Sequence, residues 1–204
     1  MNNEQLLQMY DAIRQQPDLL VKAAARKRLI NFARYMQPDL VLEPFHVVYY
    51  TLLDMFAHGK IRKMIVQQPP QHGKSEGSSR KLPAFMLGLD PDRKICIGSY
   101  AATIARDFNR DVQRIIDTPR YRELFPDTYL NGSNVVTMAN TYLRNSDVIE
   151  MVGRKGSLRV VGRGGSLTSK TVDVSILDDV YKDYAEGNSP IVRAAAWKWY
   201  TTVV

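Results

Sequence analysis

The sequence predicts an α/β fold in which a mainly parallel central sheet is flanked by helices. Three observations support this class. Apolar runs typical of buried strands alternate with segments of helical periodicity along the 204 residues. A Gly-Lys-Ser turn follows one apolar run and opens a helix, and a later apolar run ends in two adjacent carboxylates. We divide the chain into an N-terminal helical segment, residues 1–42, and an α/β domain, residues 43–204.

The first sixty residues predict three helices. The first covers residues 2–16 and ends at a proline, and the second covers residues 18–36. Residues 41–45 form a connector, within which Pro44 opens the third helix, and Gly59 can close that helix.

The rest of the chain alternates between strands and helices, with turns and one weak strand over residues 127–146. The predicted strands are Met64–Val66, Lys94–Ser99, Val148–Val152, Ser157–Val161 and Val172–Leu177. The predicted helices are Ser75–Leu87 with a kink at Pro83, Ala101–Asp117, a short turn at Tyr121–Phe125, and a last helix from Ser189-Pro190.

The composition is ordinary for a globular protein and the charge is basic. No apolar run approaches the roughly 20 residues that span a bilayer, so we expect an intracellular protein without a membrane segment. The single cysteine, Cys96, excludes an internal disulfide, and three scattered histidines do not have the spacing of a zinc site. The formal charge of +7 indicates a polyanionic partner such as nucleic acid.

The turn at Gly73-Lys74-Ser75 is typical of a phosphate-binding loop. Backbone N–H groups and the positive end of the helix dipole converge there. Lys74 would pair with the β- and γ-phosphates of a nucleotide, and the Ser75 hydroxyl would bind Mg²⁺.

The loop departs from the usual G-x-x-x-x-G-K-[ST] pattern. Gln68 occupies the first position, and two prolines after it remove two N–H donors. The phosphates would therefore be bound by the backbone amides from Gln71 to Ser75. The alternative is an ordinary strand-to-helix turn with a solvated lysine.

The apolar run that starts at Val172 ends in Asp178-Asp179. In a phosphate-loop ATPase the first acid at such a strand end holds Mg²⁺ through water, and the second polarises the attacking water. Adjacent acids are also common in turns and helix caps. Combined with the Gly-Lys-Ser turn, they predict a P-loop NTPase fold with one Mg-nucleotide at the carboxyl ends of the strands.

A glycine-rich basic segment lies between Glu150 and Asp173 and contains no acid. It is either a solvated basic face or a surface that faces phosphates of DNA or nucleotide. Its cations are Arg154, Lys155, Arg159, Arg163 and Lys170.

Five motifs in order resemble those of the large terminase subunits of tailed bacteriophages and prophages, the ATPase motors that package DNA. The likeness extends from about Asn31 to Tyr200. The motifs are Pro44-Phe45-His46, Gln68 to Glu76 with Pro83-Ala84-Phe85 and Gly88, Ser99-Tyr100 with Ile104-Ala105 and Phe108, Val161 to Thr168, and Asp178-Asp179.

The resemblance implies an ATP hydrolase with ATP and Mg²⁺ as cofactors. It implies that Ser75 and Asp178 hold the metal and that Lys74, Asp179 and Arg163 are catalytic. The nucleotide-binding residues that it implies, with the segment against the adenine given last, are Gln71, His72, Gly73, Lys74, Ser75, Glu76, Phe45 and His46.

The implied partners are double-stranded DNA, the portal protein and the small terminase subunit. A homo-oligomeric ring is implied during packaging, a monomer for an isolated fragment, and a location in the host bacterial cytoplasm with transient binding at the procapsid portal. We expect no nuclease activity, because the family's coupling segment and metal-dependent nuclease have no counterpart in these residues.

Two departures from the family leave roles open. Gln71 stands where the family often has arginine, so the charge-stabilising arginine would be Arg163, Arg159 or one from a neighbouring subunit. Asp179 stands where many such motors have glutamate, so either Asp179 or Glu186 would orient the water.

Three other functions fit parts of the pattern. A nucleic-acid or protein-docking module with a degenerate nucleotide loop fits Gln68 and the prolines. A helicase-like translocase would need a second motor domain, and a small-molecule kinase would need an acceptor pocket and a lid.

Overall fold

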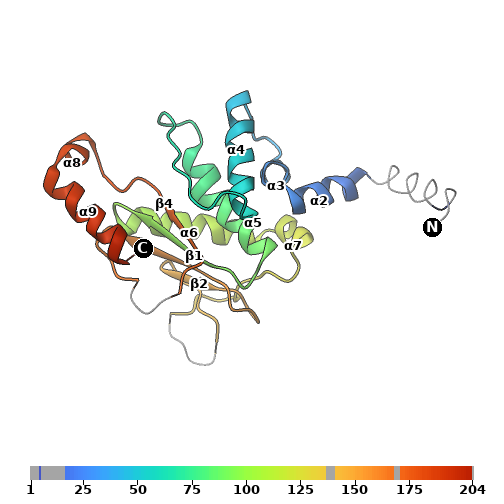
Figure 1. Ribbon diagram of the computed structural model, residues 1–204. Helices are drawn as coiled ribbons and strands as arrows, with labels where there is room; N and C mark the ends of the chain where they lie inside the picture. Colours follow the sequence, from blue (N-terminus) through green and yellow to red (C-terminus); the bar gives the residue numbers. More distant parts are fainter. Residues whose placement is uncertain (1–4, 6–16, 137–140, 168–170, 204) are drawn as a thin grey trace.

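The computed structural model describes residues 5, 17–136, 141–167 and 171–203, and in this part of the chain four strands form one sheet (Figure 1). The strand order is β2-β3-β1-β4, where β1 is Lys94–Ser99, β2 is Val148–Glu150, β3 is Ser157–Gly162 and β4 is Val174–Leu177. β1 pairs in parallel with both β3 and β4, and β2 pairs antiparallel with β3. The predicted α/β class with a mainly parallel sheet is therefore confirmed.

Helices flank the sheet in the described ranges (Figure 1). None of them is both long enough and apolar enough to cross a bilayer. They are α2 (Pro17–Lys27), α3 (Leu29–Met36), α4 (Pro44–Ala57), the π-helix η1 (Glu76–Lys81), α5 (Leu82–Leu89), α6 (Ala102–Asp117), α7 (Pro119–Leu124), α8 (Tyr184–Asn188) and α9 (Pro190–Val203).

The predicted helix over residues 18–36 is in fact two helices that meet at Arg28. The backbone of Arg28 is extended. Asp54 of α4 accepts the Leu29 N–H at 2.8 Å, so a carboxylate from another helix satisfies the first free donor of α3. The sequence pattern of residues 18–36 does not contain this long-range cap. The helix predicted over residues 2–16 lies outside the described residues except for Gln5.

The strand predicted over Met64–Val66 is wrong. The described segment from residue 63 to residue 69 contains no regular secondary structure and does not join the sheet. Its side chains alternate as in a strand, since Met64 and Val66 pack on the core while Ile65 is 91% exposed. Alternation of buried and exposed side chains indicates an extended backbone. A β-strand also needs a hydrogen-bonded neighbouring strand, and the alternation does not supply one.

The helix predicted over Ser75–Leu87 begins as a π-helix. Residues Glu76–Lys81 form η1, and the Leu82 N–H donates to Gly77 O, five residues back. Pro83 lies in the first turn of α5 and has no N–H, so it cannot continue the regular i→i−4 ladder. The kink expected at this proline takes the form of a wider helical turn before it.

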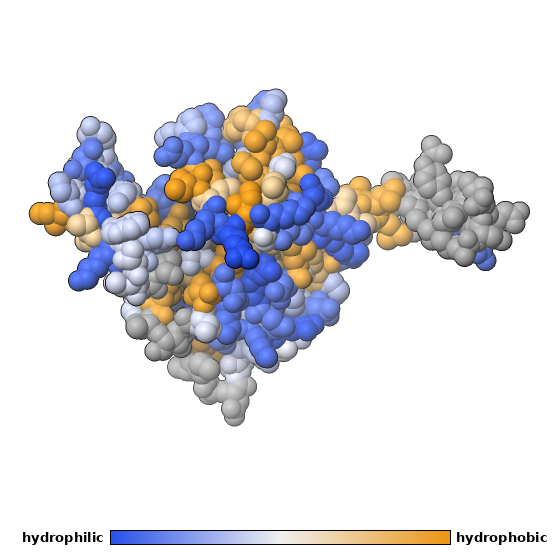
Figure 2. All heavy atoms as spheres, viewed as in Figure 1, coloured by the Kyte–Doolittle hydropathy of each residue, from blue (hydrophilic) through white to orange (hydrophobic). Residues whose placement is uncertain are grey.

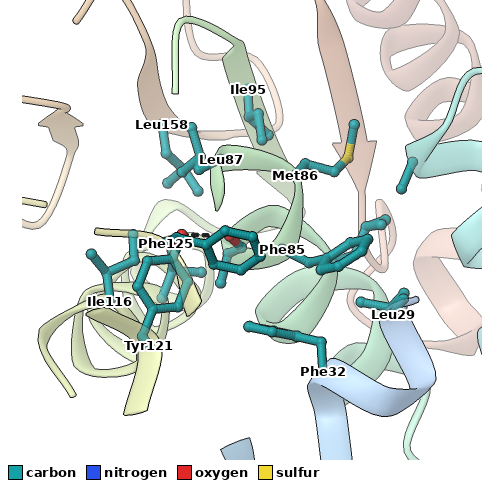
Figure 3. Close-up of a cluster of buried hydrophobic side chains, with 14 of the residues drawn as sticks. Leu29, Phe32, Phe85, Met86, Leu87, Ile95, Ile116, Tyr121, Phe125 and Leu158 are labelled. Carbon is teal, nitrogen blue, oxygen red and sulfur yellow. Dashed lines mark hydrogen bonds between the residues drawn. The ribbon is translucent and has the colours of Figure 1, made fainter. Parts of the chain in front are cut away.

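The main core lies between one face of the sheet and the helices (Figure 3). Phe85 of α5 lies at its centre, with its ring centroid 5.4 Å from that of Phe32. Ile95 and Leu158 contribute the sheet side of the same cluster. Because Leu29 and Phe32 belong to this cluster, the N-terminal helices share their core with the rest of the fold, and the boundary after residue 42 stays a prediction.

The remaining boundaries follow the sequence closely. The predicted start of α4 at Pro44 and that of α9 at Pro190 are confirmed, as are the strands β1, β2, β3 and β4 within a few residues. In the segment expected to be mostly turns, Val135 and Arg144 form an isolated antiparallel bridge. α8 was not predicted; the Asp183 side chain caps it by accepting the Glu186 N–H.

Candidate functional site

Lys74 and the two acids at the end of β4 meet at the carboxyl edge of the sheet. Lys74 Nζ lies 3.0 Å from Asp178 Oδ1 and is also hydrogen-bonded to Asp179 Oδ1. These side chains are 104 and 105 residues apart in the chain. The turn and the acidic strand end therefore form one cluster of a cation and two carboxylates.

The backbone of the loop turns sharply before Lys74. Gln71 and Gly73 both have positive φ angles, 62° and 77°. Glycine adopts such angles freely, whereas Gln71 carries a strain that non-glycine residues usually avoid. The Gly77 N–H donates to Gly73 O at 3.1 Å, so the helix already encloses the end of the loop.

A buried tyrosine of α4 is hydrogen-bonded to the backbone of the loop. The Tyr49 hydroxyl donates to Lys74 O at 2.5 Å, and the Ser78 hydroxyl donates to the same carbonyl at 2.9 Å. Burial raises the pKa of Tyr49 to about 12, so its hydroxyl keeps the proton that it donates. Tyr49 also packs so closely on Gly77 that an added Cβ would lie 2.5 Å from its ring.

Asp178 is a buried carboxylate with both oxygens occupied. Its side chain is 3% exposed, and its Oδ2 accepts the Ser79 hydroxyl at 2.7 Å while Oδ1 faces Lys74. Its backbone N–H donates to Gly98 O at 2.8 Å, which fixes it to β1. A buried charge needs such partners, because desolvation without them costs several kcal/mol.

Asp179 is the exposed member of the cluster. Its side chain is 63% exposed and its φ is 46°. The Tyr100 N–H donates to Asp179 O at 2.9 Å. Its carboxylate thus faces solvent beside Lys74 while its backbone is held by the residue after β1.

Two opposing effects act on Lys74. Burial alone lowers the pKa of the ammonium, but the hydrogen bonds to Asp179 and Asp178 outweigh burial and raise that pKa above its ordinary value. Lys74 therefore stays a cation at neutral pH, which is the state that a phosphate-binding lysine requires.

The other loop residues lie around this cluster with contacts of their own. Ser75 directly precedes η1 and is half-buried. Glu76 forms an ion pair with Lys81 at 3.0 Å, so its carboxylate is engaged within its own helix. His72 forms a hydrogen bond through Nδ1 to Pro70 O at 2.7 Å.

The segment implied to lie against adenine borders the loop. The ring centroids of Phe45 and His46 are 3.9 Å apart, and those of Phe45 and His72 are 5.8 Å apart. A Cβ added to Gly73 would lie 3.4 Å from His46 Nε2. His46 Nδ1 accepts the Glu43 N–H, which closes the first turn of α4.

Arg163 leaves the carboxyl end of β3 and holds the loop after Asp179. Its guanidinium donates to Val180 O and to Glu186 Oε2, both at 2.8 Å. The hydrogen bond from Arg163, with another from the Lys182 N–H, lowers the pKa of Glu186. Glu186 is thus ionised and engaged.

The basic segment is divided between the two edges of the sheet. Arg163 belongs to the carboxyl edge, whereas Arg159 forms an ion pair with Glu150 at 3.5 Å in the other half of the strand. Lys170 lies outside the described residues.

The residues present fit a magnesium ion that also binds phosphate oxygens. Among the described residues no group of three or more His, Cys, Asp or Glu side chains could hold a metal alone. Mg²⁺ usually takes only one or two protein oxygens, with waters and phosphates completing its shell. Ser75 and Asp178 offer such oxygens, provided that Lys74 exchanges its carboxylate contact for phosphate.

Sequence reasoning missed Ser79 and Tyr49. Ser79 follows Ser75 by four residues, which gives a weak signal that both lie on one helix face. No sequence pattern indicates Tyr49, because it reaches the backbone of Lys74 only through the packing of α4 on η1.

Two cavities lie away from the cluster. One of about 480 Å³ lies between α2, α3 and α7, and one of about 290 Å³ lies at the amino edge of the sheet. Comparisons with protein-family models, curated proteins and solved structures find no match to this chain.

Proposed function

We propose that this chain is an ATPase domain of the phage terminase large-subunit type, which hydrolyses Mg-ATP to drive double-stranded DNA into a procapsid. One observation carries the proposal. Lys74 and the pair Asp178-Asp179, from two motifs a hundred residues apart, meet at the carboxyl edge of a parallel sheet. Ligands of open α/β sheets bind at this edge.

Lys74 has the position and charge to bind phosphate. In the described state its ammonium forms ion pairs with both aspartates. Binding of a nucleotide would move the ammonium to the β- and γ-phosphates, and the amides of Gln71 to Ser75 would complete the cradle. The carboxylate of Asp178 and the hydroxyl of Ser75 would then be free to hold Mg²⁺, which supplies charge neutralisation at the transferring phosphoryl group.

Asp179 is the better placed of the two candidate acids for orienting water. Its exposed carboxylate lies beside Lys74, whereas Glu186 is already held by Arg163. Asp179 Oδ2 would accept a hydrogen bond from the attacking water and align it with the phosphate.

Arg163 acts on the acidic loop in this proposal. Its contacts with Val180 and Glu186 hold the backbone that follows Asp179. Arg159 faces Glu150 at the other half of β3, so a neighbouring subunit remains the source of an arginine for the transition state. The portal protein, the small terminase subunit and the ring are proposed from the motif resemblance alone.

Binding of a fluorescent ATP analogue with Mg²⁺ tests the proposal directly. We expect saturable binding by the chain and loss of binding in Lys74→Ala, with Lys63→Ala as the matched control because Lys63 is exposed in the same segment. Phosphate release is measured in parallel. Hydrolysis by Lys74→Ala at the parental rate would refute the assignment.

One observation favours a second function, a docking module with a degenerate nucleotide loop. The segment before the loop does not join the sheet, and Gln68, Pro69 and Pro70 replace the glycine and two donors of a standard loop. This function predicts no saturable nucleotide binding by either the parent or the variant.

A further inference from the structure

A cavity of about 290 Å³ at the amino edge of the sheet has a strongly cationic lining. It lies where β1 and β3 begin and where the turn between β2 and β3 passes; Figure 2 shows hydrophilic surface in the area of this turn. The residues that matter here are Lys94, Arg154, Lys155, Arg159, Glu150 and Thr171. We call this cavity the amino-edge pocket.

In the described part of the chain, a helix covers only one end of the sheet face that carries the pocket. Successive side chains of a strand point to opposite faces. Ile95 and Ile97 of β1 belong to the main core on one face, whereas Cys96 packs on the other face with Val161 and Trp199 of α9. α9 thus covers the carboxyl half of this second face.

The amino half of the same face carries polar side chains. Lys94 is two residues before Cys96, and strand register pairs it with Ser157, which in turn pairs with Glu150. Arg159 follows Ser157 by two residues and points the same way. Parallel sheets usually bury both faces under apolar side chains. The residues here instead suit a charged ligand or water.

The cations of the pocket are weakly paired. Arg159 has Glu150 at 3.5 Å, and the carboxylate that Arg154 meets among the described residues is a distant one, 3.8 Å away on Asp127. Lys94 Nζ donates to the neutral hydroxyl of Thr171 at 2.7 Å. In the described ranges neither Lys94 nor Lys155 has a carboxylate within ion-pair distance.

Two more carboxylates border the pocket and are held by backbone N–H groups. Asp92 accepts the N–H of Lys155 at 2.7 Å, and Asp173 accepts that of Lys94 at 2.8 Å. These contacts offset part of their charge, while the lysine side chains of the same residues remain available.

The pocket is separate from the Lys74 cluster. β1 runs from Lys94 at the pocket to Ser99 beside Asp178. Five steps of about 3.3 Å place the two edges roughly 17 Å apart. One mononucleotide cannot fill both positions, so a ligand of the pocket would be distinct from a nucleotide at the Lys74 cluster.

We propose that the amino-edge pocket binds the phosphate backbone of double-stranded DNA. Arginine and lysine contacts with phosphates supply most sequence-independent affinity for DNA, and a pocket at the lower end of the roughly 300–1,000 Å³ typical of ligand sites fits a phosphate group and its sugar. The identity of the polyanion rests on the proposed function; the site itself rests on the charges and hydroxyls described.

The test is fluorescence anisotropy of a labelled DNA duplex between about 50 and 200 mM salt. The variant is Arg154→Glu with Lys155→Glu, and the control is Lys60→Glu with Arg62→Glu, which makes the same change in net charge on exposed residues elsewhere. We expect at least tenfold weaker binding for the pocket variant. The slope of log K against log salt concentration should also be smaller in magnitude by about 2, since each lost phosphate contact removes about 0.9 from it. The control should change the slope by less than half as much.

Equal effects of both variants, or no effect of the pocket variant, overturn the site. The milder pair Arg154→Gln with Lys155→Gln must weaken binding in the same direction, and circular dichroism checks that each variant is folded. Inorganic phosphate at matched ionic strength serves as competitor; if it displaces the duplex as well as unlabelled DNA does, the pocket is a site for free phosphate and the proposal is wrong.

The same samples are titrated with the ATP analogue and Mg²⁺. Intact ATP binding with unchanged DNA affinity in the pocket variant overturns the pocket alone. Absent ATP binding in the parent with weakened DNA binding in the pocket variant supports the pocket and overturns the proposed ATPase.

Discussion

Replacing Lys74 by methionine should destabilise the nucleotide-free protein. The change removes the ammonium from Asp178, whose side chain is 3% exposed, and keeps most of the apolar stem of the lysine. Asp178 is left with the Ser79 hydroxyl as its remaining side-chain donor and with Asp179 as a neighbouring like charge. The variant therefore tests the ion pair itself and needs no ligand.

The expected loss is about 2–3 kcal/mol. Breaking a buried ion pair by removing one partner costs about 3–5 kcal/mol. Lys74 is 25% exposed and Asp178 keeps one hydrogen bond, so the expected loss lies at or just below the lower end of that range. The pair with Asp179, whose side chain is 63% exposed, adds less than about 1 kcal/mol.

The second variant is Lys74→Met combined with Asp178→Asn. It removes the buried charge together with its partner, and the asparagine can still accept the hydroxyl of Ser79. We expect it to be about 1–2 kcal/mol more stable than Lys74→Met alone, because coupled residues in contact do not contribute additively. Lys63→Met is the control for loss of an exposed lysine.

Urea unfolding followed by circular dichroism measures these differences. With a slope of about 1–3 kcal/mol/M, a loss of 2–3 kcal/mol lowers the midpoint by roughly 1 M. A Lys74→Met variant within about 0.5 kcal/mol of the parent would contradict the buried pair. So would a double variant that is no more stable than Lys74→Met alone.

Three further changes have defined outcomes. Ser79→Ala leaves an oxygen of the Asp178 carboxylate unpaired, so urea unfolding should show a loss of about 1.5–3 kcal/mol, and a neutral result would mean that solvent replaces the hydroxyl. Gly77→Ala places a Cβ 2.5 Å from the Tyr49 ring. The cost of overpacking, about 1–3 kcal/mol, should exceed the gain in helix propensity of about 1 kcal/mol, so the Tm of the variant should fall. A higher Tm would show that the Tyr49 ring moves aside. For Glu186, whose pKa is lowered by its arginine partner, the stabilisation is fully present above an ordinary carboxyl pKa of about 4.5 and is lost as the pH falls through the lowered value. The difference in Tm between the parent and Glu186→Gln should therefore shrink as the solution is acidified, and a constant difference would exclude ionisation as its cause.

Local patterns predicted most of the elements around the site. The apolar run at Lys94–Ser99 became a central parallel strand, and Pro44 and Pro190 each start a helix. These features depend on residue period and on the fixed φ of proline, and both can be read from neighbouring residues.

The features that the sequence did not predict depend on contacts between residues far apart in the chain. The break at Arg28 comes from a carboxylate on α4, and the support under Lys74 comes from Tyr49 on the same helix. The segment Met64–Val66 has the alternation of a strand but no partner in the described sheet. Strand pairing and helix capping between distant residues leave no trace in the local sequence, so the periodicity of apolar residues cannot predict them.

The position of β4 in the sheet has a consequence for its motion. β1 has neighbours on both sides, whereas β4 pairs with β1 alone among the described strands, so its outward amides have no ladder partner. In native-state hydrogen exchange, β1 should retain its protons longer than β4, which should open with a smaller free energy. The strand that presents Asp178 is thus held along one edge only, so a local opening of β4 would take this acid away from Lys74 before the central strand opens.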